Sequence, residues 1–256
     1  MTQRPLPPLP DPDRFGGSGW LARTGGVMTG SECARGLAVA SRQQVQNLWQ
    51  RVFPFLQRPG RVDDLPPVPD SRLVQLAEEA ALAQSPALLG HGYRAAIFAR
   101  ALAHIDGHRP DPELLHICGL LHDVGLMKDI AGEDFTLRSA AAARQCACDA
   151  HQPEAVGDHL ADAIIVHTTI GVTPERDGVL GAYTQYGAMV DLTGLRLAHL
   201  PKDFVAGVLR QHPRGPFKAE LIRRLEKEAR AVPGGRFAFA TRVGFGLAVK
   251  QAPFPS

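Results

Sequence analysis

The chain has few cysteines and no long apolar run. Its 256 residues include four cysteines. Cys118 lies inside an apolar stretch, where a free thiol packs as a small hydrophobe. Cys146 and Cys148 are two positions apart, and on a helix they would point to different faces rather than form a pair. No charged-then-apolar signal pattern occurs, and no apolar run reaches membrane length. We therefore expect a reducing, cytoplasmic protein with no membrane partner.

The chain also lacks a strong charge of either sign. Its formal net charge is +2, which argues against a nucleic-acid partner. The charge is less even within the sequence, because residues 201–256 carry 11 Lys or Arg against 4 Asp or Glu. This excess fits either a solvated basic helix or attraction of an anionic substrate, and the sequence leaves both interpretations open.

The alternation of apolar and polar residues that is typical of β-strands is nearly absent. Hydrophobic residues make up 45% of the chain, enough for a substantial core, and from about residue 70 to 230 they recur at helical spacing. The sequence therefore predicts an all-α fold. The exception is "RFAFATRVGFGLAV", residues 236–249, where apolar residues stand two apart. This pattern predicts one edge strand or an extended tail laid over the helices.

Composition divides the chain into three parts. Residues 1–65 are predicted to form a Pro/Gly-rich arm, extended to about residue 30, with one helix that begins at Ser41 and breaks near Pro54. Residues 66–232 are predicted to form the helical domain, and residues 233–256 a tail packed on it. The arm could dock a partner or a second subunit, so a homo-oligomer is one expectation.

Several apolar helices end on side chains that commonly bind metals. The stretch "PELLHICGLLHDV" is apolar on most sides and ends on His122 and Asp123. Burying these groups without partners is costly, and a divalent metal would satisfy both. His91 stands at the start of another apolar helix, and His167 and Asp191 each close one. Helix bundles commonly build metal sites from such convergent side chains.

Four segments carry a family resemblance: "LLGHGYRAAIFA", "DPELLHICGLLHDVGL", "DAIIVHTTIG" and "GAMVDLTGLR". Together they resemble the HD-domain superfamily of metal-dependent hydrolases, whose H…HD…D pattern falls on His91, His122, Asp123 and Asp191. "FTLRSA", "AIIVH" and "PRGPFK" narrow the resemblance to a bacterial branch similar to cyanamide hydratase. The resemblance covers roughly residues 70 to 230.

The resemblance implies an HD-domain helical bundle with a metal site between its helices. His91, His122, Asp123 and Asp191 would bind one divalent transition metal, and their nitrogen and oxygen atoms suit Fe, Zn, Mn, Ni or Co. The metal would activate a water molecule, which Asp123 would orient. We expect His167 to transfer protons or contact the substrate.

Four cations are candidates for contacting a substrate that carries or develops negative charge. They are Arg94, Lys128, Arg214 and Lys218. Nucleotidase-type members of the superfamily often place a Glu a few residues after the HD pair, whereas this chain has Lys128. This departure weakens a transfer of nucleotidase chemistry.

A second departure concerns the number of metals. Dinuclear-iron members, including oxygenases, need two further histidines between the HD pair and the last aspartate. Here His151 follows a predicted helix in a loop, His159 lies in an exposed-looking stretch, and only His167 is well placed. We therefore favour one metal. The alternative of a dinuclear-iron oxygenase requires His151 or His159 beside His167.

The leading hypothesis is an enzyme that hydrolyses or hydrates a small molecule through a metal-activated water. Two chemistries compete within it, phosphoester hydrolysis and hydration of a nitrile-like molecule. A wide basic entrance would favour phosphate, and a tight apolar pocket without Lys or Arg would favour a small neutral substrate. The remaining alternative is a non-catalytic HD-fold binding protein, which a missing ligand would indicate, and none of the four is missing.

Overall fold

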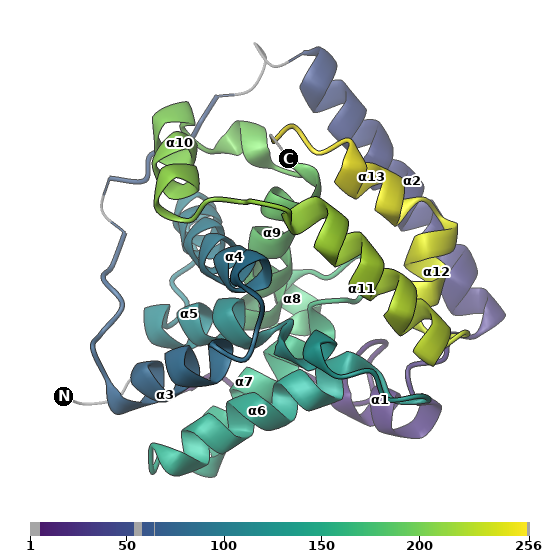
Figure 1. Ribbon diagram of the computed structural model, residues 1–256, viewed down its shortest axis with the longest axis horizontal. Helices are drawn as coiled ribbons and strands as arrows, with labels where there is room; N and C mark the ends of the chain where they lie inside the picture. Colours follow the sequence, from purple (N-terminus) through teal and green to yellow (C-terminus); the bar gives the residue numbers. More distant parts are fainter. Residues whose placement is uncertain (1–5, 54–57, 64, 255–256) are drawn as a thin grey trace.

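The computed structural model describes residues 6–53, 58–63 and 65–254, and within these ranges the chain folds into helices with no strand. The prediction of an all-α fold is therefore confirmed (Figure 1). None of the described helices has the length and apolarity to cross a membrane. The helices are α1 (Ser18–Thr24), α2 (Gly30–Val52), α3 (Arg72–Ala81), α4 (Pro86–Ile105), α5 (Pro112–Leu121), α6 (Phe135–Asp149), α7 (Glu154–Val166), α8 (Pro174–Asp177), α9 (Val179–Thr193), α10 (Lys202–Gln211), α11 (Phe217–Ala231), α12 (Arg236–Arg242) and α13 (Phe245–Lys250).

The centre of the molecule is formed by α4, α5 and α9, which pack against one another (Figure 1). Local sequence fixes where two of them begin. The Ser85 hydroxyl accepts a hydrogen bond from the Leu88 amide, and the Asp111 carboxylate accepts from the amides of Glu113 and Leu114. Each cap is followed by proline, whose fixed φ suits the first helical turn. The starts of α4 and α5 are thus encoded locally.

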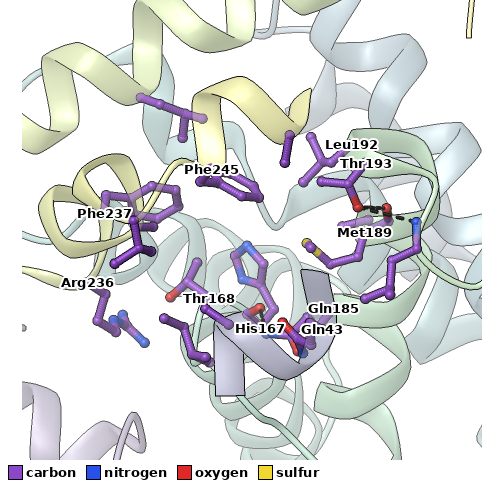
Figure 2. A pocket seen from close by; sticks show the side chains of 18 of the residues that line it. Gln43, His167, Thr168, Gln185, Met189, Leu192, Thr193, Arg236, Phe237 and Phe245 are labelled. Atoms are coloured by element: carbon purple, nitrogen blue, oxygen red, sulfur yellow. Dashed lines mark hydrogen bonds between the residues drawn. The ribbon is translucent and has the colours of Figure 1, made fainter. Parts of the chain in front are cut away.

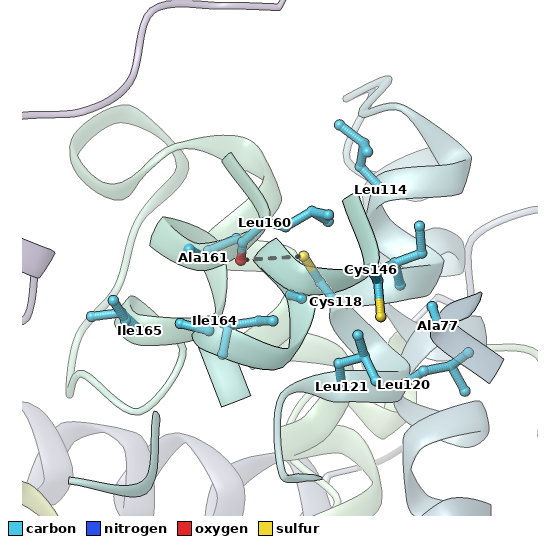
Figure 3. Close-up of a cluster of buried hydrophobic side chains, with 14 of the residues drawn as sticks. Ala77, Leu114, Cys118, Leu120, Leu121, Cys146, Leu160, Ala161, Ile164 and Ile165 are labelled. Carbon is cyan, nitrogen blue, oxygen red and sulfur yellow. Dashed lines mark hydrogen bonds between the residues drawn. The ribbon is translucent and has the colours of Figure 1, made fainter. Parts of the chain in front are cut away.

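A second layer, α3, α6 and α7, covers one side of α5 through a cluster of buried apolar side chains (Figure 3). Cys118 is fully buried in this cluster, with its Sγ 3.9 Å from the Leu160 carbonyl oxygen. Burial raises the pKa of the Cys118 thiol, so this cysteine packs as a small hydrophobe, as its apolar context predicts. Cys146 is buried and Cys148 exposed, so the two do face different ways.

The N-terminal region is more ordered than the sequence predicts. Helix α1 lies within the stretch predicted to be extended and buries Trp20. Helix α2 begins at Gly30 rather than Ser41, because Thr29 and Glu32 form a capping box. The prediction of one helix in this region is therefore wrong, while the predicted break near Pro54 lies outside the described residues.

The C-terminal stretch is also helical, so the predicted strand or extended tail is wrong. This stretch forms α12 and α13, joined by Val243 and Gly244, and both helices lie beside α11 and α2 (Figure 1). A strand would need a neighbouring strand to pair its backbone N–H and C=O groups, and the described chain has none. In a helix these groups bond within the segment itself. Val249 is fully buried, and the Lys218 ammonium donates hydrogen bonds to the carbonyls of Ala252 and Phe254. The tail is thereby fixed to α11.

A buried acid joins α11 to the start of α6. Glu228 is 4% exposed, and its Oε1 accepts a hydrogen bond of 3.0 Å from the Phe135 amide. Burial raises the pKa of Glu228 to about 7, and the charge of Asp134 acts in the same direction, whereas the Phe135 amide and Arg138 oppose it. The folded protein therefore keeps a proton on Glu228 at pH values where the unfolded chain has lost it.

We expect this acid to make the protein less stable as the pH rises from about 4.5 to about 7. The folded state binds more protons in this window, so the free energy of unfolding falls with pH, by at most about 3 kcal/mol from Glu228. Glu228→Gln should remove this part of the slope, because the amide oxygen still accepts from Phe135. Urea unfolding at pH 5 and pH 8 measures the difference. Glu226→Gln, exposed on the same helix, is the control, and equal slopes in wild type and Glu228→Gln would contradict the prediction.

Candidate metal centre

His91, His122 and Asp123 form a compact buried group between α4 and the end of α5. The two Nε2 atoms are 3.2 Å apart, and the Asp123 Oδ2 lies 3.7 Å from His91 Nε2 and 3.4 Å from His122 Nε2. Ligands around a tetrahedral metal with bonds of about 2.1 Å are about 3.4 Å apart. The three donor atoms therefore have the spacing of one face of a metal coordination sphere.

The other nitrogen of each histidine is already bound. His91 Nδ1 lies 2.8 Å from Asp191 Oδ2, and His122 Nδ1 lies 2.8 Å from the Gly119 carbonyl oxygen. These partners assign the proton to Nδ1 in both rings, so the two Nε2 lone pairs face each other. Burial lowers the pKa of His122 to about 3, which disfavours a proton between the rings. A cation is the group that fits this arrangement of lone pairs.

His167 lies next to this group but not within it. It follows the last residue of α7, and its Nδ1 bonds the Ile164 carbonyl oxygen. Its Nε2 faces the second oxygen of Asp123, Oδ1, at 3.8 Å. His167 therefore lies beside Asp123 in the wall of one cavity, and its role in proton transfer stays a prediction.

Asp191 is fully buried on the opposite side of His91. Besides His91 Nδ1, its carboxylate accepts from Arg94 Nε and Nη2, each at 2.9 Å, and from Arg214 Nη1. Burial alone would raise the pKa of Asp191, but the bonds and charges of His91 and Arg94 hold it well below its usual range. Asp191 is thus an ionised carboxylate in contact with two arginines and one histidine.

None of the four cations predicted to contact a substrate lines the cavity beside the metal-binding group, and two of them, Arg94 and Arg214, are paired with Asp191 instead. Arg94 is fully buried, and its Nη1 donates to the carbonyls of His212 and Pro213. Lys218 binds the C-terminal carbonyls, and Lys128 is exposed next to the end of a 3-10 turn.

This cavity has a volume of about 140 Å³, and its wall includes His122, Asp123 and His167. Figure 2 shows His167 among the side chains that line it. Since about 10–15 Å³ of such space holds one water, there is room for a small organic molecule. The remaining wall is mainly apolar and comes from α2, the segment that follows α7, and α9, α11, α12 and α13. It includes Ala40, Met189, Leu192, Leu221, Leu225, Phe237, Ala240 and Phe245.

Arg236 is the only Lys or Arg among the described residues that line the cavity. Its guanidinium is 2.8 Å from Asp134 Oδ2 and donates to the Ile165 carbonyl at 2.8 Å and to Thr169 at 3.2 Å. Its charge is therefore neutralised inside the protein. The cavity offers a ligand no unpaired positive group among the described residues.

The histidines required for a dinuclear site lie elsewhere. His151 is exposed just beyond α6, and His159 is half-buried on α7, where its ring nitrogens bond the carbonyls of Ala155 and Pro7. Neither residue lines the cavity. The described residues supply one group of candidate metal ligands, and that group contains neither of these histidines.

Comparison with protein-family models and with curated proteins finds no match to this chain. The described part of the chain is all-helical, and in it a buried His–His–Asp group, compatible with a metal ion, adjoins a mainly apolar cavity.

Proposed function

We propose that this chain is a metal-dependent enzyme of the HD type that hydrates or hydrolyses a small neutral molecule. The observation that carries the proposal is the triangle of His91, His122 and Asp123 beside an apolar cavity to which the described residues contribute no free cation. The H…HD pattern of the sequence supplies these same three residues. The resemblance to the HD superfamily is thus consistent with the geometry.

In this proposal the residues of the centre have two roles, metal binding and proton transfer. His91, His122 and Asp123 would hold one divalent transition metal. Such a metal acts as a Lewis acid that makes water a nucleophile near neutral pH. Asp123 presents its other oxygen to His167, whose Nε2 can take a proton from the attacking water and return it to the product. The apolar wall excludes bulk water and strengthens these polar contacts.

The charge of the cavity wall favours one of the two chemistries that the sequence leaves open. A phosphoester carries negative charge, and its recognition commonly uses Lys, Arg or further metal ions. Here Arg236, which lines the cavity, is paired with Asp134. A neutral substrate with a mainly hydrocarbon body fits this wall better, which favours the nitrile-hydrating branch of the resemblance over phosphoester hydrolysis.

The metal content and the substrate preference test the proposal together. We expect about one transition metal per chain by mass spectrometry after reconstitution, and turnover of neutral nitriles or amides at least about 100-fold above phosphomonoesters, a difference of about 3 kcal/mol. No metal after reconstitution would contradict the proposal. Two irons per chain would indicate the oxygenase alternative, and faster phosphoester turnover would overturn the neutral substrate class.

Filling the cavity should block the substrate without disturbing the metal. Ala240 lines the cavity on α12, away from the metal-binding group. Ala240→Phe should lower kcat/KM for the neutral substrate at least about 10-fold, because the ring occupies the space of the substrate. The metal content should not change. Thr241→Phe adds the same ring at the exposed next position and is the control, so equal losses in both variants would contradict the assignment of the cavity.

A further inference from the structure

We infer that Asp191 is not a metal ligand in this chain but a positioning residue, which holds His91 in the orientation that metal binding requires. This inference rests on the proposed metal site and changes its composition. The family resemblance implies four ligands, including Asp191. Among the described residues, His91, His122 and Asp123 are the one group whose ligand atoms lie within reach of one ion.

The hydrogen bonds of Asp191 leave no room for a metal. A carboxylate has about four lone-pair sites. Oδ2 accepts from His91 Nδ1 at 2.8 Å and from Arg94 Nη2 at 2.9 Å. Oδ1 accepts from Arg94 Nε at 2.9 Å and from Arg214 Nη1. All four sites are therefore occupied by donors from buried side chains.

The position of Asp191 leads to the same conclusion. It bonds Nδ1 of His91, whereas the Nε2 of that ring faces His122 and Asp123. The imidazole thus separates Asp191 from the metal-binding atoms. Histidine ligands commonly donate their other N–H to a carboxylate, which fixes the tautomer and makes the ligand more basic. Asp191 has this relation to His91.

The two arginines hold Asp191 in this place. Arg94 donates two N–H groups to the Asp191 carboxylate. Its Nη1 donates to the carbonyls of His212 and Pro213, which fixes the position of the guanidinium. The Arg214 guanidinium lies between two aromatic rings, 4.9 Å from the Phe217 centroid and 4.6 Å from that of Phe254. If Asp191 turned toward the metal, two buried guanidinium groups would lose their counter-ion, which is strongly unfavourable. Arg94 therefore acts through Asp191 rather than on the substrate.

A crystal structure of the zinc-loaded wild-type protein tests the inference directly. We expect the ion within about 2.1 Å of His91 Nε2, His122 Nε2 and Asp123, and more than about 5 Å from both Asp191 oxygens. A zinc–Asp191 distance near 2 Å would overturn the inference but leave the proposed function intact. Nitrogen-15 NMR of the metal-free protein tests the same point separately, since the proton of His91 should be on Nδ1. A proton on Nε2 would also overturn it, whether or not the protein binds zinc.

Substitution of Asp191 should weaken zinc binding without removing a ligand. We expect Asp191→Asn to retain one zinc per chain at saturation, with a Kd about 10- to 100-fold higher, as for other residues that orient metal ligands. Its cobalt form should keep the wild-type visible absorption, because the coordination number does not change. A lost site or an altered cobalt spectrum would count against the inference. Asp162→Asn is the matched control, because Asp162 is a buried carboxylate that also accepts from an arginine, Arg14 at 2.7 Å, and should leave the zinc Kd unchanged.

Discussion

Replacement of Asp123 by alanine should remove the metal and lower turnover of the neutral substrate by at least about 1,000-fold. The change deletes the only carboxylate in the triangle with His91 and His122. It also removes the group that faces His167 at 3.8 Å. A bound metal stabilises the transition state by several kcal/mol, and each 1.36 kcal/mol corresponds to a factor of ten in rate. Metal analysis of the purified variant and its kcat measure the two losses.

The control for this prediction is a buried aspartate outside the centre. Asp177 is 1% exposed and accepts from Arg14 and Arg176, so Asp177→Asn tests the general effect of altering a buried charge. It should retain about one metal per chain. If Asp123→Ala also retains one metal per chain with unchanged affinity, Asp123 is not a ligand and the proposed centre is wrong.

The three residues of the triangle could be found from the sequence because they depend on local signals. His91 lies in the helix that starts at Ser85, and His122 and Asp123 end the helix that starts at Asp111. Caps, proline at the first turn and a continuous apolar run predict both helices. Because these helices are buried, their polar ends had to meet partners inside the protein.

The role of Asp191 could not be found in this way. Its partners Arg94 and Arg214 are 97 and 23 positions away along the chain, and nothing in the local sequence pairs them. The same holds for the cavity, whose wall combines α2 with α12 and α13. One signal was available, because Thr29 and Glu32 have the spacing of a capping box and could have placed the start of α2.

The C-terminal segment shows why a two-residue period is weak evidence for a strand. Phe237 and Phe245 line the cavity from short helices, while Phe239 and Val249 are buried. In a stretch this rich in apolar residues, several periods fit equally well. A strand also needs a neighbour for its backbone groups, and the described chain supplies none.

Addition of one methyl group at Gly119 should damage both the fold and the metal centre. A Cβ at this position would lie 2.6 Å from the Ala96 Cα and 2.7 Å from the Ala96 nitrogen, which are backbone atoms of α4. The clash can be relieved only if α4 and α5 move apart, and these helices carry His91 and His122. We expect Gly119→Ala to lower the free energy of unfolding by about 2–3 kcal/mol. The metal Kd should rise at least about 10-fold as the two rings separate.

Gly157→Ala is the matched control for Gly119→Ala, because it adds the same methyl group inside a helix where there is space. Its Cβ would meet atoms of Arg144 and Ala147 at 3.5–3.6 Å, an ordinary contact distance. Since alanine favours helix over glycine, this variant should be unchanged or more stable by up to about 1 kcal/mol, with the metal Kd of the wild type. Urea unfolding and metal titration compare the pair. Equal stability of the two variants would show that the close approach of α4 and α5 at Gly119 does not hold the centre together.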